Sequence, residues 1–557
     1  MEVQDYEYYQ ERMKDVKLED ITSDEYNAII LESLRYDDPR SSMLKFITIT
    51  TSHHEENGFV VQEGEDLGWL GYFVGRSKNL EALYIDNFRG NINRNAFLRG
   101  LEHNRSIQNL QIGIDLRESF QSLIPFLRNN DSLRELGFNS IDIGLQCARN
   151  IAFLLGQSSS LKRLEIYDTD LEDDGLVEIL TAVKAHTQIE ELSMPSNYNL
   201  GREGYAALGR MLEGSRLSLL NVGHSGIDDE GLCALVEGLR NCHKLTSLNL
   251  NRSMSITEVG LRSLSTLFQS DICRLREILL DEMNIGDDEV RILAPGLANL
   301  PSLQRLTLFS NSIGDQGIQA LVGALASCNL TELSLSYNRS ITANGLTYLL
   351  PLLLAEQCTL CILDLYGIHI GDDGAAVLAN GLRGNKSLTT LRINTSGITT
   401  NGWEAFSRLL CDTSSVNNTY LSNHTLVQVG GYDMRDTPQD VEEYLDLNKF
   451  YSKFHDQAPA ICKIIDSHPD IDFTPLLQWK MKCLPLVVEW HEKAKSYLCK
   501  FNVLKELLQC RQLSAVYKFV RGMPQLAVDI YGRQKMNDIQ SDAKTKAKKK
   551  RKFDRTM

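Results

Sequence analysis

Two groups of cysteine and histidine residues have side chains that could bind zinc. Cys358 and Cys361 form a C-x-x-C pair, which supplies half of the four ligands that a structural zinc site needs. No second pair stands at a suitable distance, and Cys361 falls within a predicted strand, so both thiols are expected to pack in the fold. The run from His53 to Glu56 lacks the H-E-x-x-H spacing that places two histidines on one helix face, and we expect a solvated loop there. The sequence therefore predicts no metal site and no cofactor.

Residues 223–226 come near to a serine nucleophile motif. Gly223, His224, Ser225 and Gly226 begin like the G-x-S-x-G elbow of hydrolases, but Ile227 stands where the final glycine is needed. No G-x-x-x-x-G-K-S/T phosphate-binding loop occurs in the chain. We therefore expect a protein that is not an enzyme and has no small-molecule substrate.

The elements that position these residues repeat along most of the chain. Each unit reads L-x-x-L-x-L, then a polar turn, then an amphipathic stretch at helix spacing. A period of 28 residues on average, with apolar residues first at alternating and then at helical spacing, indicates a solenoid. The predicted strands begin at Leu80, Ile107, Leu133, Leu161, Ile189, Leu217, Leu245, Leu275, Leu303, Leu330, Leu360, Leu388 and, in degenerate form, Val416.

In eight repeats a glycine lies 14 or 15 residues after the strand start, at the expected entrance of the helix. Glycine at this point suits close packing between neighbouring units, and an adjacent Asp or Asn can cap exposed amide groups. One repeat carries Glu289 instead. The glycines are Gly175, Gly204, Gly231, Gly260, Gly317, Gly345, Gly374 and Gly402.

These residues resemble the ribonuclease-inhibitor-like class of leucine-rich repeats, L-x-x-L-x-L-x-x-N-x-I-x-x-x-G-x-x-x-L, over roughly 340 of 557 residues. The Asn of that pattern stands here at Asn197, Asn311 and Asn338, with Thr169, Ser225, Ser253 and Ser396 in other units. The resemblance implies an α/β fold: a right-handed horseshoe-shaped solenoid with parallel strands on the concave face and helices on the convex face. It implies no particular partner, because the class serves many.

The chain is expected to divide into four parts. Residues 1–79 are predicted to cap the first repeat with a helix after a capping box at Thr22–Glu25, an edge strand at Met43–Ile49 and a short helix around Trp69. Residues 80–430 hold about 13 repeats. Residues 437–540 are predicted to form an α-helical domain, either a cap for the last repeat or an independent binding module, and residues 541–557 a disordered tail.

Composition is typical of a soluble intracellular protein. The chain is 43% hydrophobic and 24% charged, and it has no apolar run of membrane-spanning length. The segment Met1–Asp15 is acidic and aromatic, unlike a secretory signal, so the twelve cysteines are expected to stay reduced. We therefore expect a cytoplasmic or nuclear location and no membrane association.

The tail differs sharply from the rest of the chain in charge. Residues 544–557 carry eight cations and one anion, a net charge of +7, so the remainder carries −22 of the total of −15. Such a cluster is typical of a nuclear import signal, of weak contacts to phosphate, or of a solubilising tail, and the sequence leaves these open. The candidate import residues are Lys548, Lys549, Lys550, Arg551 and Lys552.

The predicted concave face is the candidate binding surface. Thirteen strands at ~4.8 Å give an arc of about 60 Å, wide enough to hold a folded domain of ~35 Å. Phe309, Tyr337 and Tyr366 fall in successive repeats, where they either anchor a partner or stack on one another. The outward strand positions chosen as contact candidates are Tyr167, His224, Asn249, Asn251, Arg252, Phe309, Tyr337, Asp364, Tyr366 and Arg392.

The leading hypothesis is a non-enzymatic scaffold or adaptor that holds a protein partner on this face. One alternative is a small-GTPase activator resembling Ran GTPase-activating proteins, although those end in an acidic tail. Another is an inhibitor of a cationic enzyme, attracted by the acidic body.

Overall fold

The computed structural model describes residues 6–50, 57–62, 66–85, 94–114, 116–186, 188–431, 437–451 and 458–468. The chain forms two compact units. Unit 1 comprises Met1–His369 with Arg392–Asn394, and unit 2 comprises Ile370–Leu391 with Thr395–Met557. The predicted tail and the predicted helical domain beyond residue 468 lie outside the described residues.

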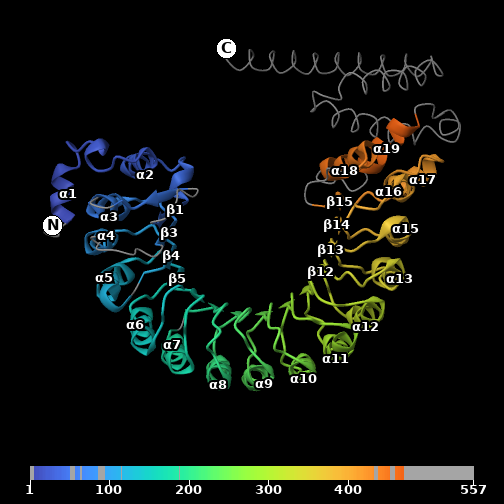
Figure 1. Cartoon of the computed structure of the whole chain (residues 1–557). Coiled ribbons are helices and arrows are strands. Elements are labelled where there is room, and N and C mark those ends of the chain that lie inside the picture. The colour runs from blue at the N-terminus through green and yellow to red at the C-terminus, as the bar shows by residue number, and fades with distance from the viewer. Residues whose placement is uncertain are drawn as a thin grey trace, which may run out of the picture. The chain divides into compact units, whose positions relative to one another are not determined.

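Unit 1 alternates strands and helices, with the strands on the inner side of a curve and the helices on its outer side (Figure 1). The strands are β1 (Phe46–Thr50), β2 (Gly58–Val60), β3 (Ala82–Ile85), β4 (Asn109–Ile112), β5 (Glu135–Asn139), β6 (Arg163–Tyr167), β7 (Glu191–Ser193), β8 (Leu219–Asn221), β9 (Ser247–Asn249), β10 (Glu277–Leu279), β11 (Arg305–Thr307), β12 (Glu332–Ser334) and β13 (Ile362–Leu365). The helices are α1 (Tyr6–Arg12), α2 (Glu25–Tyr36), α3 (Leu67–Arg76), α4 (Arg94–Leu101), α5 (Leu116–Asn129), α6 (Leu145–Leu155), α7 (Asp173–Ala185), α8 (Arg202–Leu212), α9 (Asp229–Leu239), α10 (Glu258–Phe268), α11 (Asp287–Leu297), α12 (Asp315–Leu325), α13 (Ala343–Thr347) and α14 (Leu350–Leu354).

The strands of unit 1 form one parallel sheet in the order β13-β12-β11-β10-β9-β8-β7-β6-β5-β4-β3-β1-β2. Each strand from β3 to β13 begins two residues after a predicted start, as β6 does after Leu161. The register between neighbours is constant, since Leu164 pairs with Leu136 on one side and Leu192 on the other. The predicted solenoid of parallel strands and alternating helices is confirmed.

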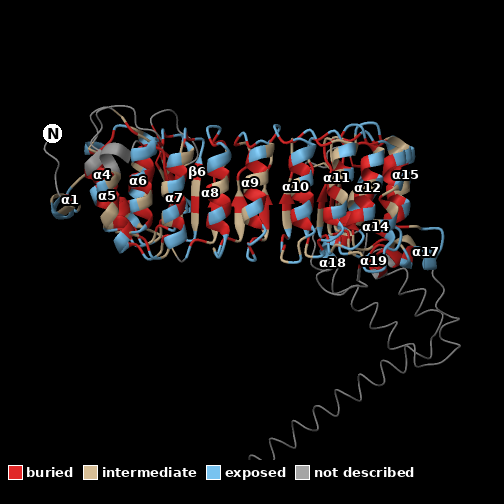
Figure 2. Ribbon diagram, turned by 90° about the horizontal axis from the view of Figure 1, so that it is seen from below, coloured by how far each residue is buried: buried red, intermediate tan, exposed pale blue. Residues whose placement is uncertain are grey.

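The core of each repeat lies between its strand and its helix. Leu161, Leu164 and Ile166 of one unit are fully buried, as are Leu176 and Ile179 of the following α7. Helices such as α7, α8 and α9 turn a buried strip inward and an exposed strip to solvent (Figure 2). Burial of such a side chain contributes about 1.5–3 kcal/mol. The buried leucines therefore account for most of the stability of each repeat.

Aspartates join the N-terminal ends of successive helices. The first residue of α11, Asp287, accepts hydrogen bonds through Oδ1 from the backbone N–H groups of Gly314 (2.7 Å) and Gly317 (2.9 Å), which open α12. We call this contact the Asp clasp. It satisfies amide groups that have no partner within their own helix. Equivalent clasps are made by Asp173, Asp229, Asp315 and, within unit 2, Asp372.

The N-terminal region corrects two predictions. The N-cap of α2 is Asp24, which accepts from the Asn27 N–H (2.9 Å), and not Thr22. The predicted edge strand is β1, but β1 lies between β3 and β2, and β2 forms the edge. The buried Asn27 side chain closes that edge, because it donates to the Val60 carbonyl (2.7 Å) and accepts from the Val60 N–H (2.9 Å). The short helix predicted around Trp69 is present as α3.

Unit 2 contains α15 (Gly371–Gly381), α16 (Thr400–Leu410), α17 (Val416–Tyr420), β15 (Gln428–Gly430), α18 (Gln439–Tyr451) and α19 (Ala458–Ser467), and β14 (Thr390–Ile393) spans the boundary of the two units. The strand predicted at Val416 is wrong. Val416 opens α17, because the hydroxyl of Ser415 accepts from the Asn418 N–H (3.1 Å) and starts a helix there. The repeat strand comes later, as β15, two residues after the buried Leu426.

Helix α18 completes the last repeat in the way that another repeat would. Asn448 is fully buried and donates through Nδ2 to the carbonyls of Leu426 (2.6 Å) and Asn423 (3.3 Å). Helix α18 thus supplies a donor to two carbonyls of the last repeat. Among the described residues no helix is long and apolar enough to cross a membrane.

Candidate partner-binding face

The strands of unit 1 present three side-chain positions to the concave side, two, four and six residues after the first leucine of each repeat. These positions point away from the core because neighbouring residues of a strand face opposite sides. We call the first of them the floor row. In the repeats from β5 to β12 it holds Glu135, Arg163, Glu191, Leu219, Ser247, Glu277, Arg305 and Glu332.

The floor row contains the same ionic arrangement twice. In the first triad, Arg163 lies 3.5 Å from a carboxylate oxygen of Glu135 and 3.2 Å from one of Glu191. In the second triad, Arg305 lies 3.0 Å from Glu277 and 3.4 Å from Glu332. Each arginine is shared by two carboxylates, so each triad keeps a net negative charge.

Partial burial shifts the acidity of Glu135 in the first triad. Burial raises the pKa of Glu135, against the opposing effect of Arg163, and the carboxylates of Glu165 and Glu191 add to the rise. A carboxylate whose pKa is raised is destabilised in its charged form, and a cation placed beside it would relieve that penalty. A cationic group beside Glu135 would therefore be favoured.

The three predicted aromatic anchors contact one another. The Phe309 and Tyr337 rings lie 5.2 Å apart at 66°, and the Tyr337 and Tyr366 rings 5.7 Å apart at 60°. All three side chains are half-buried. Edge-to-face contact holds the rings in place and leaves part of each exposed, so stacking and partner contact are compatible.

A residue in the left-handed conformation follows each strand from β5 to β13, seven positions after the first leucine. Its backbone N–H continues the ladder to the next repeat: that of Tyr337 donates to the Tyr366 carbonyl (2.7 Å), and that of Arg252 to the Asp281 carbonyl (2.8 Å). Glycine adopts this conformation at least cost, so large side chains here carry strain that is common at functional positions. Those with large side chains are His224 (φ 56°), Arg252 (60°), Glu282 (55°) and Tyr337 (60°).

Three predicted contact residues at the ends of the strands, Tyr167, His224 and Arg252, differ in their contacts with other side chains. Tyr167 is 43% exposed. His224 is held by Tyr198, whose hydroxyl lies 2.7 Å from its Nε2, and by the hydroxyl of Ser196 at 3.2 Å from Nδ1. Arg252 is exposed and forms an ion pair with Glu282 at 3.0 Å.

Two further predicted residues, Asn249 and Asn251, fix the turns between repeats. Asn249 accepts from the Asn251 N–H (2.9 Å), and Asn251 both donates to the Asp281 carboxylate (3.0 Å) and accepts from its N–H (2.8 Å). Burial raises the pKa of Asp281. The side-chain amides of Asn249 and Asn251 already form hydrogen bonds within the fold, so only part of their surface can contact a partner.

The last two predicted residues form a pair. Asp364 is only 5% exposed, accepts from the Tyr366 N–H (3.0 Å) and lies 3.5 Å from Arg392. Asp364 therefore holds the backbone of Tyr366 and the side chain of Arg392 in place. The Tyr366 and Arg392 side chains are half-buried and can contact a partner.

Sequence reasoning missed two exposed residues in the turns that follow the strands. Tyr198 is 55% exposed and Met254 is 58% exposed. They lie nine residues after the first leucine of their repeats, outside the strand pattern from which the candidates were taken. A large apolar residue in an otherwise polar turn was the available signal, because such types are frequent in interfaces.

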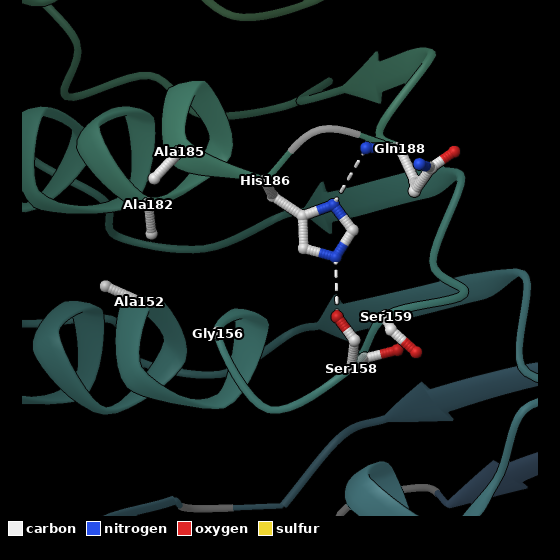
Figure 3. Close-up of a pocket in the computed structure, with 8 residues that line it drawn as sticks. All are labelled: Ala152, Gly156, Ser158, Ser159, Ala182, Ala185, His186 and Gln188. Carbon is white, nitrogen blue, oxygen red and sulfur yellow. Dashed lines mark hydrogen bonds between the residues drawn. The ribbon is translucent and has the colours of Figure 1, made fainter.

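A hollow of about 520 Å³ lies between α6 and α7, lined by Ala152, Gly156, Ser158, Ser159, Ala182, Ala185, His186 and Gln188 (Figure 3). The His186 imidazole is bound through Nε2 to the Ser158 carbonyl (2.7 Å). The remaining walls are mainly small side chains, so this hollow brings together no acid, base and nucleophile.

The C-x-x-C cysteines, Cys358 and Cys361, are both half-buried, and the Cys361 thiol donates to the Thr359 carbonyl (3.4 Å), while His53–Glu56 lie outside the described residues. In the parts of the chain that the structure describes, no three His, Cys, Asp or Glu side chains are grouped to hold a metal ion.

Comparison with known proteins agrees with the geometry of the repeats. The family model described as "Leucine Rich repeat" matches residues 299–322 and 326–350. These are leucine-rich repeats, and they are similar to those of ribonuclease inhibitors. A ribonuclease inhibitor of Mus musculus is 29% identical over 274 residues, which cover 47% of this chain and 58% of the relative. The NACHT, LRR and PYD domains-containing protein 5 of Mus musculus is 27% identical over 340 residues, 54% of this chain and 29% of the relative.

The leucine-rich-repeat chain thus spans less than two-thirds of the length of these relatives. Among solved structures, the crystal structure of the Rad7 and Elc1 complex in yeast covers 71% of this chain and 90% of that chain, with 15% identity and a TM-score of 0.41. A likeness of this degree says nothing about partner or function.

Proposed function

We propose that the protein is a non-enzymatic scaffold or adaptor that binds a protein partner on the concave face of unit 1. The observation that carries this proposal is the aromatic row of Phe309, Tyr337 and Tyr366 beside the second triad, on an open sheet face. Aromatic side chains bury much area with few rotatable bonds, and charged groups around them give specificity. Repeats of this kind in the relatives support a binding role.

The face suits a protein better than a small molecule. Its candidate contacts extend from Tyr167 on β6 to Arg392 on β14, so they are spread over nine strands and not gathered in one cavity. At ~4.8 Å per strand this is a strip of about 40 Å, the width of a small domain. A metabolite would touch only a small part of it.

A cytoplasmic or nuclear location is proposed on the composition of the chain, with the tail residues Lys548, Lys549, Lys550, Arg551 and Lys552 as an import signal. They lie outside the described residues. Contacts to nucleic acid are expected only from this tail, since the remainder of the chain carries a net charge of −22.

Inhibition of a cationic enzyme is the second candidate. It is favoured by the acidic triads and by a relative named ribonuclease inhibitor. Activation of a small GTPase has less support. Arg163, Arg252, Arg305 and Arg392 on this face each pair with a carboxylate, and such pairing competes with delivery of an arginine to a nucleotide.

Affinity capture with matched variants tests the scaffold proposal. The test variant is Phe309→Ala, Tyr337→Ala, Tyr366→Ala, and the control is Tyr26→Ala, Tyr36→Ala, Phe153→Ala, which removes three aromatic rings exposed on helices. Circular dichroism checks that both variants fold. We expect specific partners of the wild type to be lost from the test variant and kept by the control. Retention of every partner by the folded test variant would contradict the proposal.

A further inference from the structure

Two repeats, one in each unit, join their helix ends through the neutral amide group of an asparagine. Asn104 donates through Nδ2 to the Val74 carbonyl (2.7 Å) in the last turn of α3 and to the Ser77 carbonyl (3.2 Å). In unit 2, Asn423 likewise donates to the Leu382 carbonyl (3.0 Å) after α15 and to the Asn385 carbonyl (3.1 Å). Each asparagine thus satisfies a carbonyl at the end of the preceding helix and a second carbonyl three residues later.

In the last repeat a lysine adds a second donor beside the amide of Asn448, which also donates to the Asn423 carbonyl (3.3 Å). Lys463 of α19 donates through Nζ to the carbonyl of Leu410 (2.6 Å), the last residue of α16, and to the carbonyl of Asn423 (3.1 Å). These acceptors correspond to those that Asn423 itself uses one repeat earlier: a helix-end carbonyl and the carbonyl of an asparagine. The last repeat therefore has a buried ionisable donor beside its amide donor.

The lysine is enclosed without a carboxylate among the groups that act on it. Its side chain is fully buried, and burial lowers the pKa of Lys463 to about 7, with the thiols of Cys411 and Cys462 opposing that effect. The Tyr444 ring of α18 lies 5.8 Å from Nζ. Burial and the nearby Lys463 together lower the pKa of His424 to about 4, so this neighbouring imidazole is neutral near pH 7.

Asp466 of α19 and Asp440 of α18 both act on the Tyr444 hydroxyl, and two further described contacts of α19 are uncharged hydrogen bonds. His468 at its end shares a hydrogen bond with the Thr419 hydroxyl (2.7 Å), and Ser467 lies 3.4 Å from the Cys411 thiol. Neither contact provides a negative charge near Nζ. The Leu410 carbonyl at the C-terminal end of α16 gives only the partial negative charge of a helix end.

We propose that Lys463 is a proton-sensitive latch, which holds α19 on the last repeat more tightly as its amine loses its proton. In the undocked state the side chain meets water and titrates near an ordinary lysine value of about 10.4. Docking then releases a proton over the range from pH 7 to about 10. Docking strengthens as pH rises through that range and reaches its lowest, constant level below pH 7, where both states are protonated.

Hydrogen exchange measured by mass spectrometry on the full chain tests the latch. The readout is the protection factor of amides in residues 458–468 between pH 7 and 9.5, corrected for the pH dependence of the intrinsic exchange rate. In the wild type we expect protection to rise by up to about tenfold per pH unit. In Lys463→Met, which keeps the length of the side chain and removes the charge, the profile should be flat.

Two controls keep the outcome decisive. Lys449→Met removes an exposed lysine of α18 and should keep the wild-type slope, and amides of β4 in unit 1 should show no slope in any variant. Should Lys463→Met fail to fold, the wild-type profile alone still decides. A flat wild-type profile, or an equal slope in Lys463→Met, would overturn the proposal whether or not the concave face binds a partner.

Discussion

The row of helix N-termini and the concave face of unit 1 follow opposite rules. Along the helix N-termini the chain repeats itself, with an aspartate at the start of one helix and a glycine in the next, as in Asp287 and Gly317. On the concave face neighbouring repeats differ, so that Phe309 follows Asp281 at the same position. Positions that stay the same in successive repeats are needed for folding. Positions that differ between repeats can give specificity for a partner.

The exceptions at the helix N-termini support this interpretation. Helix α8 begins with Arg202 and not Asp, and the next helix is capped by its own Asp228, which accepts from the Gly231 N–H (2.8 Å). Helix α10 begins with Glu258, and in the next helix Glu289 replaces the glycine and accepts from the Gly286 N–H (2.9 Å). Where the clasp is missing, the amide groups find a local substitute, because leaving them unpaired would cost stability.

The largest effect is expected from adding a methyl group at the clasp. A Cβ on Gly317 would lie 2.5 Å from Asp287 Oδ1 and 2.8 Å from the Ile313 side chain. Gly317→Ala should lower the free energy of unfolding by about 2–3 kcal/mol, as overpacking does. The matched control is Gly323→Ala in the same α12, where no atom lies within 4 Å, and a gain of about 0.5–1 kcal/mol is expected there. Urea denaturation measures both, and equal effects would refute the clasp as the reason for the glycine.

A smaller effect is expected from removing the aspartate itself. Asp287→Ala leaves two N–H groups of α12 without their acceptor and should cost about 1–2 kcal/mol, the range measured for helix caps. The neighbouring Asp288 is 81% exposed and pairs only with Arg291 of its own helix, so Asp288→Ala should change stability by less than about 0.5 kcal/mol. Denaturation midpoints of the two variants separate a clasp from a general loss of charge at the helix start.

The same contrast shows how far sequence reasoning reaches. The strand starts are predictable because leucines at fixed spacing must face the core, and the outward positions follow from the period of two. The strand predicted at Val416 was wrong because Val416 and Leu421 fit the spacing of a strand. The N-cap at Ser415 instead starts a helix there. On the face, the burial of Asp364 and the pairing of Asn251 with Asp281 depend on contacts between adjacent repeats, which no single repeat reveals.

The smallest effect on stability is expected on the face. Arg305→Met removes the shared cation of the second triad and leaves Glu277 and Glu332 without it, yet exposed ion pairs contribute only about 0–1 kcal/mol. We therefore expect a change in the free energy of unfolding below about 1 kcal/mol, together with a changed salt dependence of partner binding, since the triad carries one more negative charge. Arg262→Met, in an exposed ion pair on α10, is the control for stability without a role on the face. If Arg305→Met instead destabilised the protein as strongly as Gly317→Ala, the face would be part of the framework, and the distinction between repeated and variable positions would fail.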